Sequence, residues 1–452
     1  PPNEQVFLLQ NFPDPNNFHI YLKPVVETPA TTTFFYILES SAQMDTQRID
    51  EAYDELLQAG GNDTIRFPII KAPNIYGDKN SLYTGYVNYR TPSGDHPNDP
   101  SVSLDDLYAW PHTLLPLPYL SKVMEATLVA LGIPGGLSGN FFADNEIHNL
   151  LFWHNTPIDL VVGTFDFVVD REATWINDYR HTYRPSFNAA ELYPDVSCLD
   201  LFVRVGNTFC LVISEKQGGI VITPVRDLLR AAPEDWTTIA EPYQQADLPN
   251  FAPVSLDYDR QGDDYSDNAQ LLRVEGGKDA EEFKVAAYTL FEKLESDELL
   301  IKSESSERRS WRVPYTIEEG TCTYLNLSKA SSFRLLFWRG IQKDGSGNDY
   351  PLATHGRRAF EQEVGAYTLD WNGDGGLYET WWEDYILMVT RGRVVSRRVQ
   401  LNAAQLSALL QWTSIKKTIM DSSGTSTAVV KSLKVKITPA GISMADVVMV
   451  TV

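Results

Sequence analysis

The sequence predicts an α+β fold dominated by β-strands, with several domains in which barrel-like antiparallel sheets flank a helical middle segment. Aromatic residues make up 12% of the 452 residues, a share that suits pleated, half-buried surfaces. Runs rich in β-branched and aromatic residues, separated by Pro, Gly, Asn and Asp, fill both ends of the chain. Helical periodicity is concentrated between them, and the length suits two to four domains.

The first predicted domain, residues 1–110, is rich in strands. Its strand-like runs are VFLLQ, FHIYLKPVV, TTTFFYILES, TIRFPIIK and SLYTGYVNYR. A helix is predicted at about residues 45–58, because its apolar residues share one face and Gly60-Gly61 follows it. The polar loop TPSGDHPNDPS at residues 91–101 marks the first boundary.

The second predicted domain, residues 111–240, is the helical middle. A helix is predicted to open at Pro118 and to end at Gly132. Its apolar stripe consists of Leu120, Val123, Met124, Thr127, Leu128 and Leu131. A second helix is predicted at about residues 143–152.

The same domain contains a predicted helix, hairpin and short helix at residues 194–229. The first helix follows Pro194, with Ser197 as its N-cap and Gly206 at its end. Its predicted core-facing residues are Leu199, Phe202 and Val203. The apolar runs CLVISE and GIVITPV around Gly218-Gly219 indicate a β-hairpin, and VRDLLRAAP indicates the short helix.

Two further domains are predicted in the second half. Residues 241–365 form a β-rich domain that carries the acidic loop YDRQGDDYSDN. Residues 366–452 begin with a helix, LYETWWEDYILMVTRG, and continue as a basic sheet with an intervening helix, AAQLSALLQ. The strands of that sheet are RVVSRRVQLN, IKKTIM, VVKSLKVKITPA and VVMVTV.

Charge and composition exclude several classes of partner. The net charge of −22 repels phosphate backbones, so we expect no specific nucleic-acid partner. No apolar run approaches the roughly 20 residues that cross a bilayer, and the N-terminal residues lack the features of a signal peptide. The three cysteines are expected to be unpaired thiols in a protein made in the cytoplasm.

One local motif suggests a cation site. In DWNGDGG, Asp370, Asn372 and Asp374 with Gly375 match the first half of a calcium loop. The twelfth position, which should be a bidentate glutamate, is Trp381. An Asx-rich turn before the next helix is therefore the favoured interpretation, a calcium site at the three residues is the alternative, and no other cofactor is expected.

The C-terminal segment is the most informative for function. From Arg391 to Val452 there are nine Lys or Arg and two Asp or Glu, a net of +7, which leaves −29 for residues 1–390. Opposite charges on one chain favour contacts between subunits. Arg391, Arg393, Arg397 and Arg398 are the predicted interface residues, and a solvated basic surface is the alternative. We found no zinc-binding pair, nucleophile elbow or phosphate loop, so no catalytic residue is predicted.

Four stretches, in order, resemble a family of tail hub, or baseplate hub, proteins from phages and prophages of Bacteroidetes. They are RFPIIKAPNIYG at 66–77, LLPLPYLSKVMEATLVALGIPGGLSGNFFAD at 114–144, PDVSCLDLFVRVGNTFCLVISEKQGGIVITPVRDLL at 194–229, and the block from LYETWWEDYI to LNAAQLSALL at 377–410. Together they cover about a quarter of the chain, and each alone is degenerate.

The resemblance implies a structural protein of the virion, made in the host cytoplasm, and not an enzyme. Such hubs resemble tail-tube rings, commonly as homotrimers, so the implied partners are further copies, tube and distal tail proteins, and a fibre or spike. The alternatives are a carbohydrate-active or cell-wall hydrolase associated with a tail, and a monomeric binding module or adhesin.

Overall fold

The computed structural model describes somewhat more than half of the chain. The described residues are 5–9, 33–35, 65–72, 86–88, 115–154, 161–171, 174–183, 186–188, 197–241, 246–247, 253–259, 272–274, 283–289, 292–294, 312–314, 322–323, 326–327, 333–343, 349–359, 362–421, 424–438, 441–442 and 444–452. The predicted helix at 45–58, the loop at 91–101 and most of the acidic loop lie outside them.

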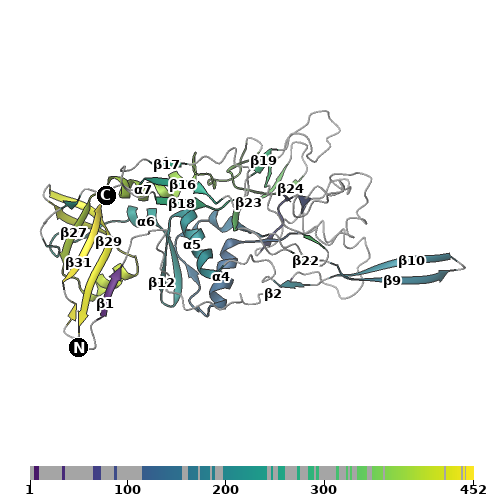
Figure 1. Ribbon diagram of the computed structural model, residues 1–452, viewed down its shortest axis with the longest axis horizontal. Helices are drawn as coiled ribbons and strands as arrows, with labels where there is room; N and C mark the ends of the chain where they lie inside the picture. The colour runs from purple at the N-terminus through teal and green to yellow at the C-terminus, as the bar shows by residue number, and fades with distance from the viewer. Residues whose placement is uncertain are drawn as a thin grey trace.

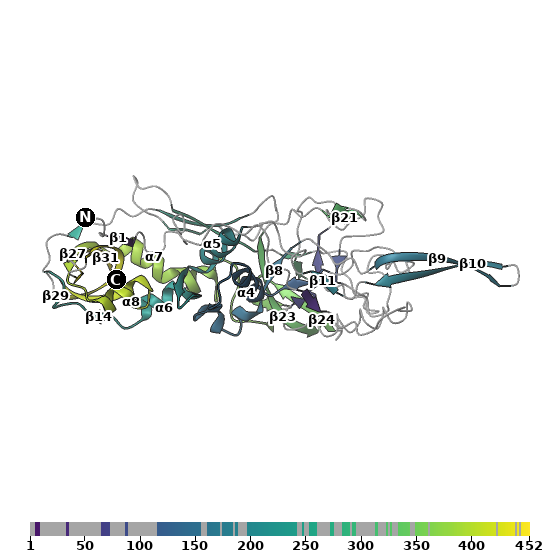
Figure 2. The same ribbon diagram turned by 90° about the horizontal axis from the view of Figure 1, so that it is seen from below.

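The molecule is elongated and rich in strands, with a large C-terminal sheet at one end and a long hairpin at the other (Figures 1 and 2). Most described strand pairs are antiparallel, and the helices lie mainly between the two ends. The predicted β-dominated class is thereby confirmed, whereas the arrangement of barrel-like domains around a helical middle stays a prediction. None of the sheets in the described residues closes into a barrel.

The N-terminal part contributes short strands to several sheets. They are β1 (Gln5–Leu9), β2 (Thr33–Phe35), β3 (Ile65–Arg66), β4 (Ile70–Lys71), β5 (Tyr86–Val87) and β6 (Leu117–Pro118). β1 pairs with β29 (Gly424–Thr438) of the C-terminal sheet, so the two ends of the chain share one sheet.

Helix α4 (Leu120–Ala130) confirms the helix predicted after Pro118. It buries Leu120, Val123, Met124 and Leu128, and Gly132 follows with a positive φ of 70°. The second predicted helix, at 143–152, is wrong. Just before this range lie β7 (Leu137–Ser138) and the 3-10 turn η1 (Phe141–Ala143). Within it the chain forms a second 3-10 turn, η2 (Ile147–Asn149), and the buried strand β8 (Leu150–Trp153). LLFW is a run of four apolar residues that a strand buries on both faces.

Helix α5 (Cys198–Phe209) is capped as predicted but runs further than predicted. The Oγ atom of Ser197 accepts a hydrogen bond from the Asp200 amide at 3.1 Å. The helix continues through Gly206 and ends where Cys210 takes a left-handed conformation. Phe202 is buried as predicted, whereas Leu199 is 37% exposed and Val203 is half-buried. The face that packs on the core consists of Leu201, Phe202, Val205 and Phe209.

The predicted hairpin is formed by β12 (Leu211–Lys216) and β13 (Gly219–Pro224), and α6 (Val225–Arg230) follows it. The turn residues are Gln217 and Gly218, both at positive φ, one position earlier than predicted. β7 adds a parallel strand beside β13. Gly135 packs so tightly here that a Cβ atom on it would lie 2.4 Å from the Gly219 amide nitrogen.

Beyond β8 a long hairpin extends from the body, formed by β9 (Val161–Arg171) and β10 (Thr174–Tyr183) (Figures 1 and 2). β11 (Ser186–Asn188) pairs with β2. The next strands are β14 (Glu234–Asp235), β15 (Ala246–Asp247), β16 (Val254–Tyr258), β17 (Leu272–Val274), β18 (Phe283–Ala287), β19 (Glu292–Leu294), β20 (Arg312–Pro314), β21 (Cys322–Thr323) and β22 (Asn326–Leu327).

A central sheet follows, in which β23 (Arg334–Lys343) lies between β8 and β24 (Asp349–Thr354). A small pair, β25 (Arg358–Ala359) and β26 (Gln362–Glu363), precedes the aromatic segment. That segment opens with the π-helical turn η4 (Tyr378–Trp382) and continues as α7 (Glu383–Arg391), which confirms the predicted helix.

The C-terminal sheet has the predicted elements in the predicted order. They are β27 (Val394–Val399), α8 (Ala403–Leu410), β28 (Lys416–Asp421), β29, β30 (Gly441–Ile442) and β31 (Ala445–Thr451). α8 begins with a capping box between Asn402 and Gln405. Its Leu406 and Leu409 pack with Trp236, Val430 and Leu433 beneath the sheet.

The two edges of this sheet meet the same segment of chain. β14 pairs with β28 at one edge, and β15 pairs with β27 at the other. Between them the Trp236 amide donates to the Thr418 carbonyl at 2.8 Å, and the Glu241 amide donates to the Arg398 carbonyl at 2.8 Å. Residues 234–241, which we call the bridging segment, therefore span the open side of a strongly curled sheet, which Figure 2 shows end-on.

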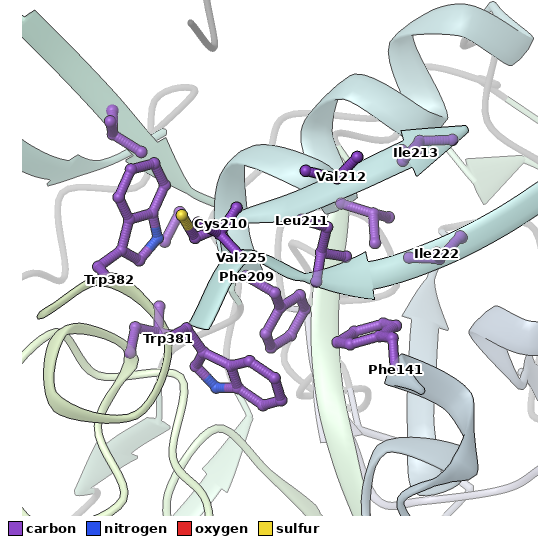
Figure 3. Packing of buried hydrophobic residues seen from close by; sticks show 14 of the residues in the cluster. Phe141, Phe209, Cys210, Leu211, Val212, Ile213, Ile222, Val225, Trp381 and Trp382 are labelled. Atoms are coloured by element: carbon purple, nitrogen blue, oxygen red, sulfur yellow. The ribbon is translucent and has the colours of Figure 1, made fainter. Parts of the chain in front are cut away.

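The largest core cluster joins residues that are far apart in sequence. Phe141, Phe209 and Trp381 form a triangle of rings with centroids 5.1–5.7 Å apart (Figure 3). The cluster draws on the second, third and fourth predicted domains. The boundaries at 110, 240 and 365 remain predictions.

Two other expectations concern the cysteines and the membrane. Cys198 and Cys210 form no disulfide, and burial raises the pKa of the Cys210 thiol well above its usual value. Cys322 lies in β21, a strand of which the structure describes the backbone only. In the part of the chain that the structure describes, no helix combines the length and apolar character that a membrane span requires.

Candidate functional site: an assembly surface

The predicted interface arginines divide into exposed and buried residues. Alternation along β27 places Arg397 beside Val395 and Val399 on the core side, where Arg397 is 4% exposed. Arg398 lies on the opposite side with 57% of its side chain exposed. Arg391 and Arg393 are exposed as well. Arg397 therefore contributes to the interior of the sheet and Arg398 to its surface, while Arg391 and Arg393 are exposed at the end of α7 and just before β27.

Strand register places a further cation on the same face as Arg398. Arg398 pairs with Asp446 in β31, which pairs with Lys434 in β29. We call this side of the sheet the outer sheet face; by register it includes Ser396, Arg398, Ser432, Lys434, Asp446 and Val448. Among these residues there are two cations and one carboxylate.

The ion pairs on the outer sheet face are loose. The guanidinium of Arg398 lies 3.7 Å from Asp446 and 3.8 Å from Glu241, and all three side chains are more than a third exposed. Exposed pairs of this kind contribute about 0–1 kcal/mol, so their partners are readily exchanged. The cations are available to carboxylates of another molecule.

Lys417 shows that not all of the C-terminal basic residues are on this surface. Its side chain is fully buried, its ammonium is hydrogen-bonded to Glu234, and it lies 4.4 Å from the ring centroid of Trp236. Burial works to raise the pKa of Glu234, but the hydrogen bond and charge of Lys417 outweigh it, so this pKa is lowered. The pair ties β28 to the bridging segment 234–241.

A second buried ion pair lies in the centre of the molecule, and the sequence analysis missed it. Nη1 of Arg339 lies 2.5 Å from the Glu146 carboxylate, and Nη2 donates to the Gly356 and Tyr367 carbonyls at 2.8 and 2.6 Å. Glu146 also accepts from the Ala366 and Tyr367 amides. The pair joins η2, β23 and the loop before η4, which is a structural role. Nothing in the local sequence pattern links two residues 193 positions apart.

The aromatic turn η4 is held by Arg226 from α6. Its guanidinium lies 4.0 Å from the ring centroid of Trp381 and donates to the Thr380 carbonyl at 2.7 Å. A π-helical turn leaves carbonyls without their usual helical partner, and here Arg226 binds one of them. This contact also serves packing, because Trp381 is 2% exposed.

The DWNGDGG loop forms a tight turn whose acidic groups have other partners. Asp370 accepts a hydrogen bond from the Thr368 hydroxyl at 2.8 Å and lies 3.5 Å from Nε2 of His355. Asp374 is 85% exposed and lies 3.8 Å from Arg357. Among the described residues no group of three or more His, Cys, Asp or Glu is placed to hold a metal ion. The arrangement favours the turn, and calcium binding stays an untested prediction.

The buried histidine of the central sheet is also structural. His154 is fully buried at the end of β8, where its Nε2–H donates to the Pro116 carbonyl. Burial lowers the pKa of His154 to about 4, although the hydrogen bond opposes the shift. The ring is therefore neutral near pH 7 and holds β8 against the segment before α4.

Known proteins give no further identification. A scan against protein-family models finds no match, and a search of the curated proteins finds no relative. The site is therefore interpreted from the chain itself: a basic outer sheet face on a curled sheet, attached to an aromatic core that carries buried polar pairs.

Proposed function

We propose that this chain is a structural subunit of a phage tail, at the hub or distal end, where it forms a ring-shaped homo-oligomer, with a trimer as the proposed size. In this role it organises the tail tube, the baseplate and the attachment of a fibre or spike, and it performs no catalysis. The curled C-terminal sheet with its bridging segment acts as the barrel-like unit of the ring.

The observation that carries the proposal is the convergence of the four stretches that resemble tail hub proteins. Stretches 114–144, 194–229 and 377–410 supply the three rings of the aromatic triangle. Stretch 66–77 packs Ile70 against residues of the second stretch in a neighbouring cluster. Three of the four stretches share one core and the fourth packs beside it, which supports the resemblance as a property of the whole fold.

The charge distribution supports assembly in particular. A basic outer sheet face on a chain with a net charge of −22 has a ready partner in the acidic body of another copy. Oppositely charged surfaces on one chain favour contacts that repeat around a ring.

Negative-stain imaging of the purified protein tests this function. We expect closed rings of uniform size at low salt. A population of single elongated particles at micromolar concentration would contradict the proposal, and turnover of a glycan by those particles would favour the hydrolase alternative.

A further inference from the structure

The bridging segment covers both edges of the curled C-terminal sheet with few backbone contacts. At the β28 edge it contributes the two-residue strand β14, which Figure 2 shows at the rim of the sheet. At the β27 edge, beside β15, it contributes a bridge from Ala240 to Val399 and accepts a hydrogen bond at the Ile239 carbonyl from the Gln400 amide at 3.1 Å. Strand edges pair readily with other chains when they are free, so this short segment protects two of them.

The bridging segment inserts into a core that the C-terminal residues otherwise form by themselves. Among the described residues, the fully buried members of this cluster come from residues 395–449, apart from Trp236 of the bridging segment. The segment is joined to α6 by Ala231, Ala232 and Pro233, which are all exposed. On that side it can therefore leave the sheet without displacing α6.

Glu234 holds the bridging segment through three hydrogen-bond donors. Its carboxylate accepts from the Lys417 ammonium of β28, from Nε2 of Gln405 in α8 at 3.2 Å and from the Ser414 hydroxyl at 3.0 Å. The Lys417 side chain is fully buried. Because a buried charge without a counter-charge is strongly unfavourable, the segment and the ion pair are released together, and Lys417 is then hydrated.

Trp236 makes a favourable and an unfavourable contribution to the closed state. Its ring is fully buried, and the Lys417 ammonium lies 4.4 Å from the ring centroid. Its Nε1–H group is also buried and has no hydrogen-bond acceptor within the described part of the chain. Water would accept this hydrogen bond in an open state, so the unpaired donor favours opening. Closure therefore depends on Glu234 as well as on the packing of Trp236.

We propose that the bridging segment is an autoinhibitory latch. While Glu234 binds Lys417, the segment occupies the edges of β27 and β28; when it opens, the same segment of a second copy binds there. The occupant is a second copy because its segment has the same sequence and makes the same contacts with the sheet. This inference goes beyond the proposed function and applies to the chain whether or not it forms a ring.

Hydrogen exchange of the full chain, measured by mass spectrometry, tests the latch. Glu234→Gln removes the charge that holds the segment, so exchange in the bridging segment and at Gln400 should rise together by about tenfold or more. The pairing of β29 with β31 should stay protected. A rise between these two strands as large as that in the segment would show that the segment is an integral part of the sheet, and the proposal would be wrong.

Asp235→Asn is the matched control for this charge change. It removes one negative charge from the same strand, and its side chain keeps an acceptor for the Thr237 amide, which donates to Asp235 at 2.8 Å. Exchange in this variant should equal that of the wild-type chain. Equal exchange in Asp235→Asn and Glu234→Gln would overturn the latch.

Replacement of the buried cation separates the latch from a general loss of stability. In a Lys417→Met chain no buried charge loses its partner, so adding Glu234→Gln should raise exchange by less than about threefold. A rise of about tenfold in this background as well would mean that the ion pair does not hold the segment.

A labelled peptide with the sequence of residues 233–241 tests what the open edges bind. Its apparent affinity scales with the open fraction, so the Glu234→Gln chain should bind it about tenfold or more tighter than the wild-type chain does. The same peptide carrying Glu234→Gln should bind more weakly, because it does not restore the pair with Lys417. No binding of the native peptide despite faster exchange would overturn the exchange of segments between copies.

Discussion

At the scale of single residues, Arg397 and Arg398 show how position on a strand decides the role of a charge. Arg397 lies on the buried side of β27 together with Val395 and Val399, while Arg398 is exposed and makes only loose ion pairs. The alternation of VVSRRV contains this information, because Arg397 is two residues from a valine on each side. The net charge of the C-terminal segment does not distinguish the buried arginine from the exposed one.

We therefore expect the two arginines to respond differently to substitution. Arg397→Glu leaves an uncompensated carboxylate in the core and should lower the free energy of unfolding by about 3–5 kcal/mol. Arg398→Glu should change it by less than about 1 kcal/mol, because exposed pairs are weak. Urea denaturation of both variants measures this difference, and equal destabilisation would show that Arg397 is not held in the interior.

His154 should make stability depend on pH. Its pKa is lowered to about 4 in the folded chain from 6.5, so the unfolded chain binds a proton at higher pH than the folded chain does. Stability is therefore fully present above about pH 6.5 and falls as pH drops towards 4, by up to about 3 kcal/mol.

The measurement is denaturant unfolding at several values between pH 7 and pH 4. His154→Gln keeps a donor for the Pro116 carbonyl and cannot titrate. The free energy of unfolding of this variant should therefore fall less steeply with decreasing pH, by the slope that corresponds to about one bound proton. An unchanged slope in the variant would mean that another group carries the pH dependence.

At the scale of elements, the helix α5 was predicted correctly in its start and incorrectly in its face. Ser197 is a clear N-cap signal, whereas Gly206, which the sequence indicated as the end, lies inside the helix and is buried. Local signals mark the beginning of a helix well, but its end here is fixed by tertiary packing of Phe209 and Cys210.

Two residues of α5 test the corrected face. Phe202 is 1% exposed, so Phe202→Ala should cost about 3–5 kcal/mol of unfolding free energy. Leu199 is 37% exposed on the same helix, and Leu199→Ala should cost less than about 1 kcal/mol. Comparable losses for the two variants, measured by thermal or urea denaturation, would contradict the assigned face.

Gly135 tests the approach of the segment after α4 to the β12–β13 hairpin. The Gly135 amide donates to the Gly218 carbonyl at 3.0 Å, and a Cβ atom would collide with backbone atoms there. Gly135→Ala should therefore destabilise the fold by about 2 kcal/mol or more. At Gly356 a Cβ atom meets its neighbours at 3.5 Å or beyond, so Gly356→Ala is the control and should be tolerated. Retention of full stability by Gly135→Ala would show that the contact is looser.

At the scale of the whole molecule, the sequence predicted the β-dominated class and the C-terminal element order, because alternation and capping are local. The predicted helix at 143–152 failed because LLFW is short and apolar all round, a pattern that a buried strand and a buried helix share. Local patterns did not predict how the edges of the curled sheet are covered or the Arg339–Glu146 pair, since both depend on contacts between distant segments.

The central claim is that this chain works as an assembled subunit held partly by charge, and its mass in solution tests that claim most directly. Sedimentation equilibrium at 0.05 M and 1 M salt measures the mass of the particle. We predict a particle of three copies of the 50.9 kDa chain at low salt and a shift towards the single chain at high salt, where the Debye length falls to about 3 Å. A single-chain mass at both salt concentrations would contradict the account.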